Sequence, residues 1–181
     1  MAEDIFASGA VNGRTNGEII LSRSVPGDAA YHPCDEAFPD DEIPLSLVTS
    51  FRNWSSTEIY AGTRRDLWVS VPANLSGPAS LLVCQDGGGY LDRNGPIRAT
   101  QVLDSLMNAN KIRPTVGVFV MPGRFKNSTD AEAREQRSKE YDTTDDTYVR
   151  FIDDELLPFV EGNLKVELSR NPIEQIGRAH V

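Results

Sequence analysis

The sequence has few of the side chains that catalytic and metal sites most often use. Its 181 residues include two cysteines, Cys34 and Cys84, and two histidines, His32 and His180. Two cysteines are too few for a disulfide scaffold, and no pair of Cys or His residues has the spacing of a metal site. No serine stands in a G-x-S-x-G frame. We therefore expect no metal and no cofactor, and a complete Ser–His–acid triad cannot be built from these residues.

Long apolar runs and an excess of positive charge are also missing. No apolar run approaches the roughly 20 residues that span a bilayer. The net charge of -9 disfavours nucleic acid and anionic membrane surfaces, so neither is expected as a partner. Residues 1–6 have neither the basic start nor the apolar core of a secretory signal. This favours the cytoplasm, with the periplasm and secretion kept as alternatives.

The chain divides into three segments of different composition. Residues 1–44 are rich in Gly, Pro, Asp and Ser, which predicts an irregular N-terminal arm. Residues 45–175 carry the regular apolar pattern of a folded domain. Residues 176–181 break that pattern and match what a common sequencing-adapter oligonucleotide encodes in one reading frame. We interpret them as a non-native tail, in preference to a short terminal strand, so His180 has no role.

Four segments of the domain predict strands. The apolar runs 80–84 and 115–121 are typical of strands that are covered on both faces. Residues 45–51 partly alternate, as a half-exposed antiparallel strand does. Residues 58–71 predict a further strand pair, which Pro72 closes.

Helical periodicity follows each apolar run. The first helix is expected to begin at Pro96 and to end at Asn110. The charged residues 124–144 predict a surface loop or a short helix. Residues 148–163 predict a second helix, with a kink or a loosened last turn at Pro158. The alternation of strands and helices indicates an α/β layered fold, with a largely parallel central sheet, antiparallel N-terminal strands and flanking helices.

Three glycines follow the apolar strand directly, and residues 85–90 read Gln-Asp-Gly-Gly-Gly-Tyr. A helix and a second strand come next, which places this loop at the carboxyl edge of the sheet, where ligands bind. Its spacing does not fit the phosphate-binding motifs. A tight turn and a loop that stabilises an oxyanion both remain open from the residues alone.

A second cluster, Arg137, Glu140 and Tyr141, lies in the charged segment. If that segment is helical, Arg137 and Glu140 share a face and can pair. Composition favours a solvated ion pair, which contributes at most about 1 kcal/mol.

Several motifs, taken in order, resemble the enterochelin-esterase-like branch of the α/β-hydrolases. The likeness extends over roughly residues 50–172, and the order and spacing of the motifs carry it. The matching segments are 59–65, 69–73, 84–90, 102–106, 118–123, 137–142 and 155–158. Residues 45–175 would then be the N-terminal part of an α/β-hydrolase domain.

The resemblance implies a serine ester hydrolase that acts on small-molecule carboxylic esters, such as siderophore esters. It implies an oxyanion loop at Gly87, Gly88, Gly89 and Tyr90, and substrate-side residues at Asp86, Arg137, Glu140 and Tyr141. Arg137 would hold an anionic or polyhydroxy substrate. Residues 171–172 look like the turn before the family's serine elbow, and the family's acid and histidine come later still. We therefore expect residues 1–181 alone to be inactive.

Two other functions remain in view. One is a non-catalytic binding domain on a hydrolase-like fold, because a fold does not fix a function. The other is a lactone or carbohydrate-ester hydrolase, which would share the mechanism and differ in substrate.

Overall fold

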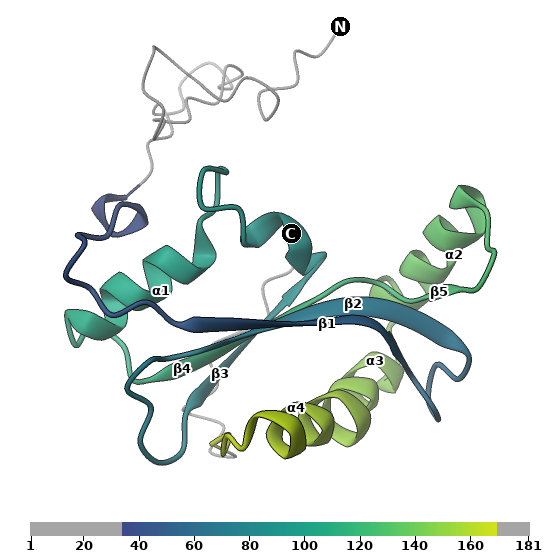
Figure 1. Ribbon diagram of the computed structural model, residues 1–181. Coiled ribbons are helices and arrows are strands. Elements are labelled where there is room, and N and C mark those ends of the chain that lie inside the picture. Colours follow the sequence, from purple (N-terminus) through teal and green to yellow (C-terminus); the bar gives the residue numbers. More distant parts are fainter. Residues whose placement is uncertain (1–33, 170–181) are drawn as a thin grey trace, which may run out of the picture.

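The strands form one five-stranded sheet in the computed structural model, which describes residues 34–169 (Figure 1). The strand order is β1-β2-β4-β3, and β5 pairs with β2. Neighbouring strands run antiparallel, except that β3 and β4 run parallel. The bounds are Leu47–Ser55 for β1, Thr63–Val71 for β2, Ser80–Gln85 for β3, Thr115–Val120 for β4 and Arg124–Phe125 for β5.

The predicted α/β fold with antiparallel N-terminal strands is confirmed. Both apolar runs are strands, and every residue of β4 is buried, as expected for a strand that is covered on both faces. The parallel share is smaller than predicted: within residues 34–169 it consists of the β3–β4 pair and one bridge between Ala79 and Leu168. A parallel pair needs a long crossover, and helix α1 (Ala99–Asn108) supplies it.

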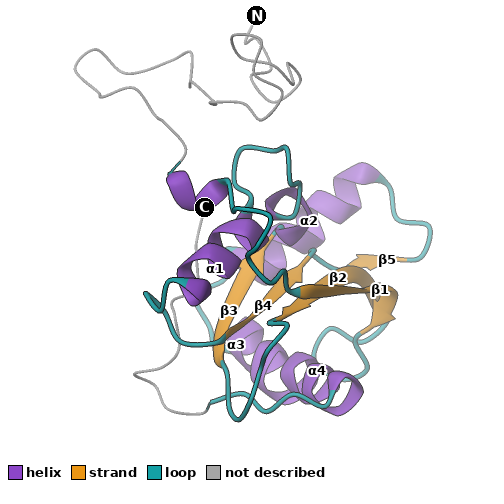
Figure 2. Ribbon diagram, turned by 60° about the vertical axis from the view of Figure 1, so that its left-hand side comes forward, coloured by secondary structure: helices purple, strands orange, loops and turns teal. Residues whose placement is uncertain are grey.

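Helices cover both faces of the sheet (Figure 2). Helix α1 lies on one face, and α3, the π-helical segment η3 and α4 follow one another on the other face. The bounds are Asp130–Tyr141 for α2, Thr147–Arg150 for α3, Phe151–Leu156 for η3 and Leu157–Leu164 for α4. The core between the sheet and α3–α4 includes the buried side chains Leu67, Val69, Val118, Phe151, Ile152 and Val160.

Helix α1 begins at Ala99, later than the Pro96 predicted from the sequence. The residue before it, Arg98, has a left-handed backbone with φ of 52°. A right-handed helix cannot contain such a residue, so the helix starts after it. The helix ends at Asn108, before the predicted Asn110, whose φ of 53° is again left-handed.

The second predicted helix is widened ahead of Pro158. A kink or a loosened last turn was expected at the proline, but the irregular part is the π-helical segment that precedes it. Proline clashes with the carbonyl four residues earlier, and a π-turn is one way to accommodate that conflict. The helix ends at Leu164, followed by a left-handed Lys165 with φ of 55°, in place of the predicted stop at residues 162–163.

The turn before β2 is organised by Glu155 of η3. Its carboxylate accepts hydrogen bonds from the three successive amides of residues 57–59, at 3.0, 3.2 and 2.5 Å, and from the Ser56 hydroxyl. The predicted strand pair over 58–71 is therefore wrong, because its first part is this turn and the rest is β2 alone. Burial opposes the ionisation of Glu155, but the hydrogen bonds outweigh it and lower its pKa.

Residues 34–44 of the predicted N-terminal arm pack on α1. They include the short 3₁₀ helix η1 (Asp35–Ala37). The Ser105 hydroxyl of α1 donates to the carbonyl of Glu36 at 2.8 Å, and Lys111 pairs with its carboxylate at 2.7 Å. Among the described helices, none has the length and the apolar character to cross a membrane. The following predicted features lie outside the described residues: residues 1–33 with His32, the turn at 171–172, and the tail 176–181 with His180.

Candidate active site

The glycine loop, residues 86–90, lies where the sequence predicts it. It leaves the carboxyl end of β3, whose last residue Gln85 is paired with Val120, the last residue of β4. The loop is entered through Asp86, which has a left-handed backbone with φ of 51°. Gly87–Tyr90 then form a short 3₁₀ helix, η2. Asp tolerates the left-handed region better than most residues, so the sequence fits this sharp exit from the strand.

The three glycines meet three different environments. A Cβ on Gly87 would lie 2.5 Å from the backbone of Phe119, so this position admits no side chain. Gly88 lies against Trp68 and Met121, and its amide donates to the Met121 Sδ at 3.4 Å. Around a Cβ on Gly89 the space within 4 Å is open. A thioether is a weak acceptor, so an oxygen atom that binds the Gly88 amide would displace only a weak hydrogen bond.

Arg137 of α2 is bound to the glycine loop. Its Nε lies 3.1 Å from both carboxylate oxygens of Asp86, and its Nη2 lies 2.5 Å from Oδ2. The guanidinium carbon also lies 5.1 Å from the centre of the Tyr141 ring. The Asp86 hydrogen bond raises the pKa of Arg137, and burial opposes it. The predicted pairing of Arg137 with Glu140 is wrong, because each has a different partner.

Glu140 is buried with Arg65 of β2 beneath the site. Arg65 reaches its two carboxylate oxygens at 2.7 and 3.1 Å, and both side chains have no exposed area. The amide of Gly123 and the side chain of Gln136 also donate to Glu140, at 3.2 and 2.9 Å. The Glu140 carboxylate is therefore out of reach of solvent and ties α2 to the ends of β2 and β4.

Sequence reasoning missed Arg65, although a signal for it was present. Thr63, Arg65 and Leu67 alternate onto one face of β2, and that face is buried. An arginine on a buried face requires a carboxylate partner. In the structure that carboxylate is Glu140.

Tyr141 packs against Tyr148 behind the loop. Their ring centres lie 5.2 Å apart at 86°. Burial raises the pKa of both hydroxyls. Asp86 is a neighbour of Tyr141, and Gln85 is a neighbour of Tyr148. Within residues 34–169, neither hydroxyl has a hydrogen-bond partner of ordinary geometry. Both therefore stay protonated at neutral pH.

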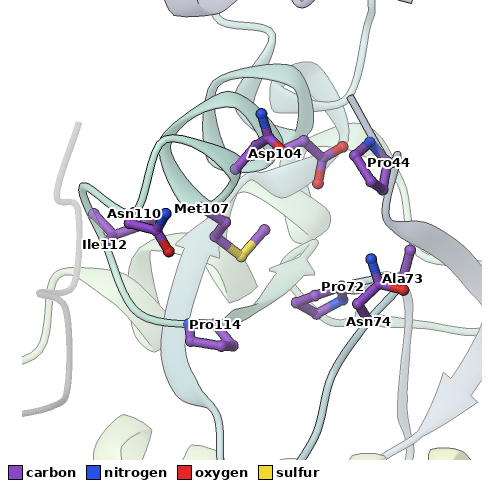
Figure 3. Close-up of a pocket in the computed structure, with 10 residues that line it drawn as sticks. Pro44, Pro72, Ala73, Asn74, Asp104, Met107, Asn110, Ile112 and Pro114 are labelled. Atoms are coloured by element: carbon purple, nitrogen blue, oxygen red, sulfur yellow. The ribbon is translucent and has the colours of Figure 1, made fainter. Parts of the chain in front are cut away.

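Two cavities flank α1. One of about 390 Å³ adjoins the glycine loop, because Leu91 lines it beside Trp68, the contact of Gly88. The other, of about 360 Å³, lies near the amino ends of β3 and β4, away from the loop (Figure 3). Asp104 borders both, and the amide and hydroxyl of Ser46 donate to it. Burial raises the pKa of Asp104 against these hydrogen bonds.

The segment that contains the glycine loop also matches the model of a known protein family. The model of the esterase family, described as "Putative esterase", matches residues 60–173. The chain belongs to this esterase family. A search of the curated proteins finds no match.

Solved esterases share the fold of the chain. The ferric enterobactin esterase of Salmonella typhimurium is 16% identical with a TM-score of 0.56, over 81% of this chain and 34% of its own. The enterobactin esterase of Shigella flexneri is 18% identical with a TM-score of 0.54, over 81% and 34%. A feruloyl esterase module of Clostridium thermocellum is 14% identical with a TM-score of 0.51, over 77% and 42%. The predicted resemblance to enterochelin-esterase-like α/β-hydrolases is confirmed, and the chain spans about a third of the length of the enterobactin esterases.

Proposed function

We propose that the full-length protein hydrolyses carboxylic esters by acyl transfer to a serine, and that residues 86–90 form its oxyanion loop. Membership of the esterase family supports ester hydrolysis in general. The observation that carries the proposal is the Gly88 amide at the carboxyl end of β3, whose acceptor among residues 34–169 is the thioether of Met121. An alkoxide oxygen would bind this donor far more strongly than the Met121 Sδ does.

The neighbouring residues support this role for the loop. Asp86 and Arg137 are each about two-fifths exposed, at 40% and 41% of their side chains, and they border the loop on its α2 side. Tyr141 packs behind them, and the adjoining cavity of about 390 Å³ offers room for part of a substrate. Glu140 supports the site from below, because its buried carboxylate is fully engaged with Arg65 and Gly123.

We further propose that the serine, histidine and acid lie outside residues 1–181. No G-x-S-x-G frame occurs in this stretch. The full-length protein is then expected to hydrolyse 4-nitrophenyl acetate and to react with a fluorophosphonate probe, whereas purified residues 1–181 do neither. A full-length protein that is silent in both assays would contradict the proposal and favour a non-catalytic binding domain.

A sharper test addresses the loop itself. A trifluoromethyl ketone forms a tetrahedral adduct with a nucleophilic serine, and the adduct carries the oxyanion. In the full-length protein labelled with ¹⁵N, the amide protons of Gly87 to Gly89 should move strongly downfield on adduct formation. The amide of Gly162, in α4 on the other face of the sheet, is the matched control and should not move. An adduct that leaves the loop amides unchanged would assign the oxyanion to other donors.

A further inference from the structure

The residue that sets the direction of the glycine loop is held by a side chain from another element. Asp86 has a left-handed backbone, φ 51°, directly before the first glycine. For a residue with a side chain this conformation is less favourable than the extended or helical regions. If Asp86 moved to one of those regions, the peptide planes that follow would rotate, and the amides of residues 87–89 would point elsewhere.

The partner of Asp86 comes from a helix that is fixed independently. Arg137 lies one turn before Glu140, whose carboxylate is anchored to Arg65 and to the amide of Gly123. The start of α2 is fixed by a reciprocal capping box between Thr129 and Glu132. The position of α2 therefore does not depend on the ion pair. The ion pair constrains the conformation of the loop, because the helix that carries Arg137 is already fixed.

Two of the three guanidinium nitrogens of Arg137 are already bound to the loop. Its Nε and Nη2 both bind Asp86, and its flat guanidinium lies over the Tyr141 ring. A substrate carboxylate that bound the same edge of the guanidinium, Nε and Nη2, would have to displace Asp86, and the loop would then lose its anchor. The arrangement suits a side chain that orients the loop better than one that receives a substrate anion.

We propose that Arg137 is a positioning residue that holds the glycine loop in its working conformation through Asp86. The expected effect on kcat rests on the proposed function, whereas the expected effect on the conformation of the loop does not. The guanidinium touches no reacting atom and acts by keeping the left-handed conformation of Asp86.

Hydrogen exchange in the full-length protein tests the structural consequence. Arg137→Gln and Asp86→Asn each break the ion pair, and Asn keeps the tolerance for a left-handed backbone. Each variant should speed amide exchange at residues 87–89 about two- to fivefold, the range expected for a partly exposed ion pair. The double variant should exchange no faster than either single one. Arg134→Gln, an exposed arginine on the same helix, is the matched control and should change nothing.

Kinetics with 4-nitrophenyl acetate, an uncharged substrate, test the kinetic consequence. Arg137→Gln should lower kcat about two- to tenfold, less than the factor of about 10²–10³ for losing an oxyanion donor outright, and should leave KM within about twofold. Asp86→Asn should have the same effect, without additivity in the double variant, and Arg137→Lys should restore part of kcat. A raised KM with additive effects would instead make Arg137 a substrate contact and overturn the proposal.

The two tests fail separately. If exchange at residues 87–89 responds as expected but no form of the protein hydrolyses the ester, the positioning role stands and the proposed function fails. If the ester is hydrolysed but exchange in Arg137→Gln matches that in Arg134→Gln, the positioning role fails and the proposed function stands.

Discussion

One helix, α2, contributes to two ion pairs whose surroundings differ sharply. The Arg65–Glu140 pair has no exposed side-chain area, whereas Arg137 and Asp86 keep 41% and 40% of theirs. The buried pair joins α2 to two strand ends of the core, and the exposed pair joins the same helix to the glycine loop. Burial makes the loss of either partner of the first pair costly, because the other charge would then be buried without a partner. Solvent makes the second pair weak, so it can orient the loop without deciding whether the protein folds.

The largest effect is expected at the buried pair. Glu140→Ala would leave Arg65 without a carboxylate in the core, and breaking one side of such a pair typically costs about 3–5 kcal/mol. Urea unfolding of the full-length protein should show this loss in the free energy of unfolding. Glu135→Ala, an exposed acid on the same helix, should change it by no more than about 0.5 kcal/mol. A loss for Glu140→Ala as small as for this control would remove the distinction between the two pairs.

A smaller effect is expected within the glycine loop. In Gly87→Ala the added methyl would lie 2.5 Å from the Phe119 backbone, whereas in Gly89→Ala it would meet no atom within 4 Å. Forced overpacking costs about 1–3 kcal/mol, so the first variant should be destabilised by that amount and the second should stay near wild type. Thermal unfolding of both variants tests this difference. Equal melting temperatures would mean that the loop can shift at Gly87 without cost, which would contradict the close packing of Gly87 on β4.

Glu155 offers a third kind of carboxylate, partly buried and bonded by backbone amides in place of an arginine. Its pKa is lowered in the folded protein, so its contribution to stability is present above the unfolded pKa and is lost as pH falls through the folded value. Glu155→Gln should therefore reduce stability at pH 7 by about 1 kcal/mol and flatten the loss of stability below about pH 4.3. Urea unfolding at pH 7 and pH 4 tests this. If the variant loses as much stability between pH 7 and pH 4 as the wild type does, the pH dependence comes from other carboxylates.

The sequence predicted the elements that follow a single period and missed those that depend on distant partners. The apolar runs of β3 and β4 and the glycine loop between β3 and α1 were predictable, because each reflects local burial. The turn at 57–59 was not, because its amides are bonded by Glu155, far along the chain.

The same limit applies to the candidate site. Arg137 and Glu140 do lie on one helix, the helical alternative of the prediction for this segment, but spacing within a helix indicates only a neighbour on that helix. Their true partners, Asp86 and Arg65, come from other elements. For Arg65 the alternation of β2 carried a usable signal. For Asp86 no local pattern distinguishes a carboxylate that is held by an arginine from one that faces solvent.

The smallest change in stability is expected at the exposed pair, and it would sharpen the comparison with the buried one. Arg137→Gln should lower the free energy of unfolding by at most about 1 kcal/mol, because solvent and salt screen the pair. Sodium chloride at 1 M should reduce the difference in the free energy of unfolding between the wild type and the variant nearly to zero, because it screens the pair. Urea unfolding at low and high salt, with Arg134→Gln as the control, measures both. A loss above 2 kcal/mol would mean that the two pairs share one role, and α2 would then hold the loop and the core as a single unit.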